Sequence, residues 1–211
     1  MINYNTKNFV VVNFPANSGG KLLANVLAIG KNFLHQHDNF AKLKIENQWS
    51  EKKSFEISRS VYEHKIKISA HFELDTYKLA GFNYDINNLD QEYLATELWK
   101  KLTHQDQYYF VAINHNPYNS WQHYPLAKHI ITENFEFVLS KRDIILEKKW
   151  HFDFASCKNF TKFNMESIHK KESFQKEIDK ICEYVGITIK NKKYINFIRE
   201  SFLKTVMLGY K

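Results

Sequence analysis

The chain has 211 residues, of which 44% are hydrophobic and 16% aromatic, so it can bury a sizeable core and is too apolar to be disordered. Its formal charge of +7 suits an anionic ligand, and it also suits nucleic acid or an anionic membrane surface. Two cysteines, Cys157 and Cys182, exclude a disulfide framework. We expect one cytoplasmic domain, residues 1–211, because the sequence shows neither a signal-peptide pattern nor an apolar run of about 20 residues that could span a membrane.

The first predicted element is a strand over residues 9–14, whose sequence FVVVNF is apolar and rich in β-branched residues. Such a run is typical of a strand buried on both faces of a parallel sheet. Pro15 and the adjacent Gly19 and Gly20 interrupt it, and from Lys21 onward the apolar residues recur at helical spacing. The N-terminal part therefore predicts a strand, a glycine turn and a helix.

The remaining elements alternate between helices and strands. Short apolar runs predict further strands at residues 108–114 and 135–139. Apolar spacing predicts helices over residues 50–66, 90–102, 125–132, 172–184 and 194–208, with Gly186 ending the fourth of them. This alternation favours βαβ units, and we expect a P-loop-type three-layer α/β/α fold with a central, mostly parallel sheet and a helical C-terminus.

The turn between the first strand and the first helix is a candidate anion site. Backbone N–H groups at a helix N-terminus and the helix dipole favour negative charge there, and small residues let the backbone approach a phosphate closely. Asn17, Ser18, Gly19 and Gly20 would supply that backbone, and Lys21 would add a positive charge. A tight turn without a ligand would use the same glycines.

The turn matches the nucleotide-binding pattern G-x-x-x-x-G-K-[ST] in part. Gly20 and Lys21 fit its G-K pair, whereas Pro15 replaces the first glycine and Leu22 replaces the hydroxyl that holds Mg²⁺. The missing hydroxyl counts against ATP with Mg²⁺, which is kept as an alternative ligand.

The same turn resembles the phosphosulfate-binding loop of sulfotransferases, a P-K-S-G-T-T-W/L motif that directly follows the first strand. Residues 18–23 (SGGKLL) match its S-G-T-T-W-L part, and Asn17 stands where the family has a lysine. The resemblance implies a sulfotransferase-like fold in which Asn17 to Leu22 hold the donor, 3′-phosphoadenosine 5′-phosphosulfate (PAPS). Lys21 would then stabilise the charge on the group in transfer.

Three later segments resemble the family in the same order along the chain. Residues 113–117 (INHNP) are similar to its K-T-H-x-P segment, which implies that His115 is the catalytic base. Residues 135–143 (FEFVLSKRD) are similar to a strand that leads to an Arg-Asp pair, which implies that Arg142 helps to hold the nucleotide. Residues 178–187 (IDKICEYVGI) are similar to a helix end near the family's C-terminus.

These observations lead to the hypothesis of a sulfotransferase-like transferase that moves a sulfonate or phosphoryl group from a nucleotide donor to a hydroxyl or amine. The acceptor would be a small molecule or a peptide. Two alternatives stay open: a kinase or NTPase that uses ATP and Mg²⁺, and a catalytically degenerate P-loop binding module. The basic charge would also allow nucleic acid as a partner. The histidine spacings match no metal-site pattern, so no metal is predicted.

Overall fold

The fold is described from a computed structural model. The description covers residues 9–15, 18–30, 36–37, 50–62, 68–69, 72–73, 78–79, 82–83, 110–114, 127–141 and 157–207. None of the helices in these ranges is both long and apolar enough to cross a bilayer.

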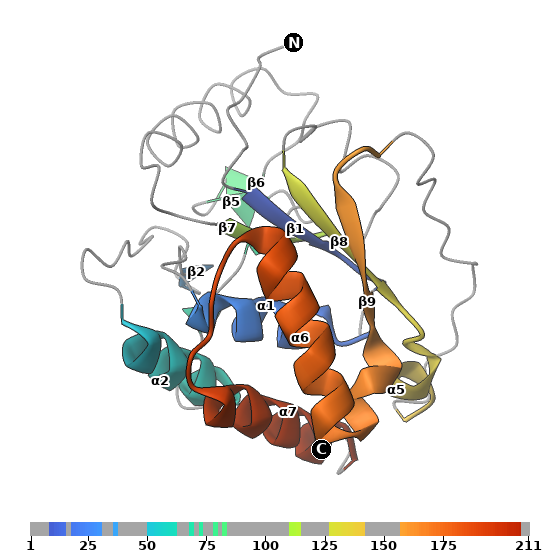
Figure 1. The fold of residues 1–211 in the computed structure, drawn as a ribbon. Coiled ribbons are helices and arrows are strands. Elements are labelled where there is room, and N and C mark those ends of the chain that lie inside the picture. Colours follow the sequence, from blue (N-terminus) through green and yellow to red (C-terminus); the bar gives the residue numbers. More distant parts are fainter. Residues whose placement is uncertain are drawn as a thin grey trace.

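A five-stranded parallel sheet organises these residues (Figure 1). All four neighbouring pairs in it are parallel, which confirms the expected mixed α/β class with a parallel sheet. Its strands, in spatial order, are β4 (Phe72–Glu73), β7 (Phe110–Asn114), β1 (Phe9–Asn13), β8 (Lys128–Glu133) and β9 (Phe160–Asn164). Two short antiparallel ladders join β2 (Gln36–His37) to β3 (Ile68–Ser69) and β5 (Lys78–Leu79) to β6 (Phe82–Asn83).

The central strand β1 is buried on both faces, as its apolar run predicts. Val10, Val11 and Val12 are all completely inaccessible to solvent. Val10 and Val12 belong to the main hydrophobic cluster, whereas Val11 lies between them on the opposite face of the sheet. Parallel strands that are covered on both faces read as continuous apolar runs, which is why this strand is recognisable from sequence.

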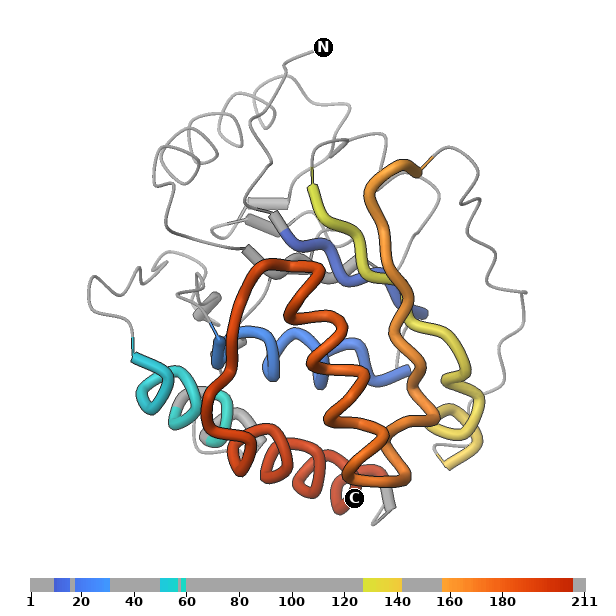
Figure 2. Tube along the Cα trace, in the orientation of Figure 1, coloured from blue at the N-terminus to red at the C-terminus, as the bar shows by residue number. Residues whose placement is uncertain are grey.

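In the described ranges, five α-helices and one 3₁₀ helix surround the sheet. The α-helices are α1 (Gly20–Ile29), α2 (Glu51–Tyr62), α6 (Lys171–Val185) and α7 (Lys192–Met207), together with the short α5 (Glu136–Ser140). The 3₁₀ helix, η2 (Met165–His169), connects β9 to α6. In the tube view, α7 runs beside α2, and α1 lies between these helices and the sheet (Figure 2).

The expected helix 172–184 is confirmed with its glycine stop. Helix α6 is amphipathic and buries one face, which includes Phe174, Ile178 and Ile181. Gly186 follows with φ of 82°, and its N–H donates to the Cys182 carbonyl at 2.8 Å. Glycine is favoured at a left-handed position after a helix because it has no Cβ, so the sequence signal and the geometry agree.

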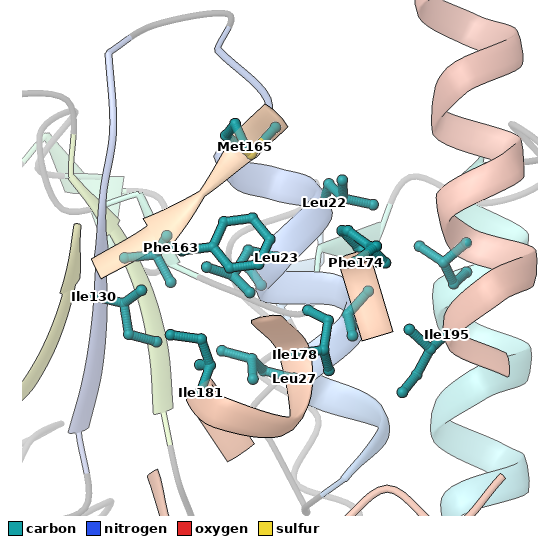
Figure 3. Packing of buried hydrophobic residues seen from close by; sticks show 14 of the residues in the cluster. Leu22, Leu23, Leu27, Ile130, Phe163, Met165, Phe174, Ile178, Ile181 and Ile195 are labelled. Atoms are coloured by element: carbon teal, nitrogen blue, oxygen red, sulfur yellow. The ribbon is translucent and has the colours of Figure 1, made fainter. Parts of the chain in front are cut away.

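The core lies between the sheet and the helical layer formed by α1, α6 and α7 (Figure 3). Leu23 and Leu27 of α1 are fully buried there against side chains from β8, β9 and α6. The rings of Phe163 and Phe174 meet edge to face at 6.0 Å between centroids. Helix α1 is therefore stabilised mainly by the apolar side chains that it buries in the core.

Two expected elements are wrong, and they are neighbours. Residues 125–132 were predicted to be helical but contain strand β8, and residues 135–139 were predicted to be a strand but form most of helix α5. Both are short apolar runs, whose periodicity does not separate a strand from a buried helical turn. Asn134, with φ of 56°, marks the boundary, because this left-handed residue ends the strand before the helix begins.

The other predictions divide into three groups. The strands at residues 9–14 and 108–114 and the helices at 50–66 and 194–208 are confirmed as β1, β7, α2 and α7. Strand β9 was not predicted, because its sequence FTKFN carries a lysine and two polar residues in five. The helix at 90–102 lies outside the described residues, and the second helical layer of a three-layer fold stays a prediction.

Burial of the Cys182 thiol makes stability depend on alkaline pH. Burial raises its pKa from 9.0 to about 12, so above pH 9.0 the unfolded chain loses this proton before the folded chain does. The free energy of unfolding should therefore fall as the pH rises from 9.0 towards 12, with a slope of up to about 1.4 kcal/mol per pH unit from this group. Burial also raises the pKa of Tyr184, which acts in the same direction.

Urea denaturation of the wild type and Cys182→Ala across this pH range measures the effect. The variant should lose the Cys182 part of the slope, whatever its stability at neutral pH. An unchanged slope would show that the thiol does not titrate differently in the folded state.

Candidate functional site

The glycine turn lies at the point where the chain switches from adding strands on one side of β1 to adding them on the other. From β1 the chain passes to β4 and β7 on one side, and then crosses to β8 and β9 on the other side. In open α/β sheets, ligands bind outside the carboxyl ends of the strands at such a switch point. Because β1 ends at Asn13 and α1 begins at Gly20, the turn between them occupies this position.

Ser18 closes the turn on itself. Its hydroxyl donates to the Pro15 carbonyl at 2.7 Å, and its backbone N–H donates to the same oxygen at 3.2 Å. Ser18 is also completely buried. In this conformation both donors of Ser18 are used inside the turn, so the residue shapes the loop. The direct contact with an anion that the sequence predicts would require Ser18 to release the Pro15 carbonyl.

The two glycines are each placed against bulky core side chains. A Cβ on Gly19 would lie 2.8 Å from Met165 Cε and 2.9 Å from Phe202 Cζ, and its φ of 95° favours glycine in any case. A Cβ on Gly20 would overlap the ring of Phe14. Packing alone therefore explains why both positions are glycine.

Three groups at the start of α1 remain suited to an anion. Among the described residues, the backbone N–H groups of Gly19 and Gly20 donate to no acceptor. Lys21 follows on the exposed side of the first helical turn. Unbonded amides at a helix N-terminus next to a cation provide a weak anion site, because the helix dipole adds to the charge.

Leu22 has no contact with solvent. Together with Leu23 it points into the core between the sheet and the helical layer, and both side chains are fully buried (Figure 3). The position that holds Mg²⁺ in the G-K-[ST] pattern is therefore an apolar anchor of the helix here.

Polar side chains that the sequence reading did not single out tie the neighbouring strand ends together. Thr132 of β8 donates from Oγ1 to the Asn13 carbonyl at 3.3 Å, and Asn13 Nδ2 donates to the Ile130 carbonyl at 3.2 Å. Asn134 Nδ2 donates to Asn164 Oδ1 at 3.1 Å, which links the ends of β8 and β9. Asparagines directly after apolar runs were the available signal for these residues.

Three predicted site residues, Asn17, His115 and Arg142, lie outside the described residues. The chain positions next to two of them are described. Asn114, just before His115, pairs with Asn13 across the β1–β7 ladder. Lys141, just before Arg142, follows the short helix α5, so the strand expected before Arg142 is wrong.

Comparisons of the chain with known protein families, with curated proteins and with solved structures find no match. Any function is therefore argued from the residues and their geometry.

Proposed function

We propose that this protein is a sulfotransferase-type P-loop transferase whose nucleotide donor binds at the glycine turn before α1. The position of the turn is the observation that carries the proposal. It follows the central parallel strand, it lies at the switch point of the sheet, and it opens a helix with Lys21 in its first turn. Each of these features favours an anionic group at the same place.

The burial of Leu22 favours sulfonate transfer over ATP hydrolysis. A P-loop NTPase uses a hydroxyl at this position to hold Mg²⁺, and a fully buried leucine offers no ligand to a metal. The sulfotransferase motif has an apolar residue there, and sulfonate transfer needs no metal. The resemblance and the packing therefore support the same chemistry.

The proposed reaction forms a bond between the sulfur of PAPS and an acceptor oxygen or nitrogen. The bond from sulfur to the bridging phosphate oxygen breaks, and adenosine 3′,5′-bisphosphate leaves. His115 would accept the proton of the acceptor, and Lys21 with the amides of Gly19 and Gly20 would stabilise the negative charge on the group in transfer. Arg142 would help to hold the nucleotide.

Calorimetric titration with adenosine 3′,5′-bisphosphate tests the proposal. We expect binding without Mg²⁺, and Lys21→Ala should weaken it about tenfold, the loss expected for one hydrogen bond to a charged group. Lys158→Ala is the matched control, since Lys158 is exposed but remote from the turn in sequence. Absence of binding at millimolar ligand, or full affinity of Lys21→Ala, would remove this site assignment.

A binding module without catalysis is the second candidate, and the geometry of Ser18 favours it. Because both Ser18 donors are used by the Pro15 carbonyl, the turn offers fewer groups to a transition state than an open phosphate loop does. Release of the bisphosphate from PAPS with phenol and amine acceptors separates the two. Binding without release in any of these mixtures would favour the module.

A further inference from the structure

Helices α2 and α7 run parallel and begin at the same corner of the molecule. The Glu51 carboxylate, at the start of α2, accepts from the Lys190 N–H at 3.1 Å and from the Asn191 N–H at 2.6 Å, just before α7 begins. One turn further along, Phe55 of α2 stacks on Tyr194 of α7 with 3.9 Å between ring centroids, and the two helices lie side by side (Figure 2). Because these contacts follow the same order along both helices, the two N-termini, which are the positive ends of the helix dipoles, are neighbours.

Five exposed lysines surround these two helix starts. We call them the basic corner: Lys52 and Lys53 on α2, and Lys190, Lys192 and Lys193 on or just before α7. The two groups of lysines are far apart in the sequence, and the parallel packing of the helices brings them together. Like charges this close repel one another unless a counter-charge is near.

Nearby carboxylates neutralise only part of the charge of the basic corner. Both oxygens of Glu51 accept from backbone amides, Asp179 pairs with Lys192, and Glu56 lies one turn beyond the first lysines along α2. Within the described residues, the other four lysines of the basic corner take part in no ion pair. Their ammonium groups can therefore pair with an external anion.

Lysine side chains, rather than helix amides, are the groups that such an anion would meet. Ser50 Oγ accepts from the Lys53 N–H at 3.2 Å, and Asn191 Oδ1 accepts from the Lys193 N–H at 3.2 Å, so each helix start is capped by a side chain of its own segment. Long, flexible lysines spread over two helix starts suit the repeated charges of a polymer better than one small ion.

The basic corner has no apolar side chain to insert into a bilayer. In residues 50–53 and 188–193, the exposed side chains are the five lysines and Thr188, whereas Ile189 is only 2% exposed. Helices that bind a membrane surface bury an apolar face between the lipid headgroups. A polyanion in solution therefore fits this surface better than a lipid surface does.

The aromatic rings beside the basic corner interact with other protein groups. The planes of Phe55 and Tyr194 are stacked within 5° of parallel, and the Arg59 guanidinium lies over the Phe197 ring at 5.4 Å from its centroid. Proteins that bind single strands stack bases on aromatic side chains. Because the rings here already stack with each other and with arginine, the surface suits the phosphates of a duplex, whose bases are enclosed.

From this arrangement we infer that the basic corner binds the phosphate backbone of double-stranded nucleic acid without reading its sequence. The lysines neutralise phosphates and release the counterions that surround them, so the affinity falls steeply as salt is added. The surface carries no group placed to read base edges, which is why one duplex should bind as well as another. This inference does not rest on the function proposed for the glycine turn.

Fluorescence anisotropy of the full chain with a labelled DNA duplex of about 20 base pairs tests the inference. We expect a dissociation constant of about 1 µM at about 50 mM salt and a value about a hundredfold weaker at about 200 mM, as about four phosphate contacts would give. A duplex of unrelated sequence should bind within about threefold. Combining Lys52→Gln, Lys53→Gln, Lys190→Gln and Lys193→Gln should weaken binding at least about tenfold and flatten its dependence on salt.

A matched variant separates the basic corner from net charge. Glutamine at Lys158, Lys170, Lys171 and Lys176 removes the same number of charges from exposed positions elsewhere, and binding should stay within about threefold of the wild type. Equal losses in the two variants, or no binding of either duplex at low salt, would overturn the assignment. Tighter binding to phosphatidylserine vesicles or to polyglutamate than to the duplex would overturn nucleic acid as the partner. Lys21→Ala should leave duplex binding unchanged, and a loss as large as that of the corner variant would place the duplex at the glycine turn instead.

Discussion

Replacing Gly20 with alanine is expected to destabilise the protein by about 3 kcal/mol, the upper part of the range for overpacking a core. The new methyl group would overlap the ring of Phe14, which is itself 2% exposed and cannot move into solvent. Alanine would gain about 0.5–1 kcal/mol of helix propensity over glycine, which is too little to offset the overlap. The free energy of unfolding in urea measures the difference.

A double-mutant cycle identifies the cause. Phe14→Leu alone should destabilise the chain, but in the Gly20→Ala background it should restore part of the stability, because the smaller side chain leaves room for the methyl group. Gly30→Ala at the other end of α1 is the comparison: its Cβ would lie 2.9 Å from Ile189 Cγ1 and 3.3 Å from the Thr188 carbonyl oxygen, a milder overlap that should destabilise less than Gly20→Ala. Additive effects of the Phe14 and Gly20 substitutions would contradict the packing explanation.

This prediction changes how mutations in the turn should be interpreted. Loss of ligand binding in a Gly19 or Gly20 variant would not demonstrate a phosphate cradle, because the core is disturbed at the same time. Lys21 is exposed, so its replacement tests the ligand with little effect on packing. Binding data from Lys21→Ala therefore carry more information about function than data from the glycines.

The parts of the fold that the sequence predicts are those in which local pattern and tertiary environment agree. Strand β1 is a continuous apolar run because both faces are covered, and α6 combines helical periodicity with Gly186 at a left-handed position. Strand β8 and helix α5 were interchanged because each is a short apolar run next to Asn134. The identity of β8 depends on its pairing with β1 and β9, which local periodicity does not encode.

Tertiary contacts also limit how far single residues of the candidate site can be predicted from the sequence. The sequence predicts a turn suited to an anion after the first strand from three residues alone, Gly19, Gly20 and Lys21. Gly19 is also required by Met165 and Phe202, which come from segments far along the chain, so this second reason for it could not be predicted.

Arg199 should contribute as much to stability as any core side chain, although it is charged. It lies on α7 and is 8% exposed, with its Nε donating to the Ile168 carbonyl at 2.7 Å and its Nη2 to the His169 carbonyl at 2.9 Å. These carbonyls are at the end of η2, where a helix leaves its last carbonyls without partners. The guanidinium therefore caps η2 from a different helix and fixes the segment between β9 and α6.

Arg199→Met is expected to lower the free energy of unfolding by about 3 kcal/mol, because methionine fills the space but leaves two carbonyls unsatisfied. Arg199→Lys keeps the charge but not the planar fork, so it should recover only part of this loss. Lys204→Met, an exposed position on the same helix, should change stability by less than about 0.5 kcal/mol. If Arg199→Met were as stable as the wild type, these two hydrogen bonds would not be what holds η2 in place.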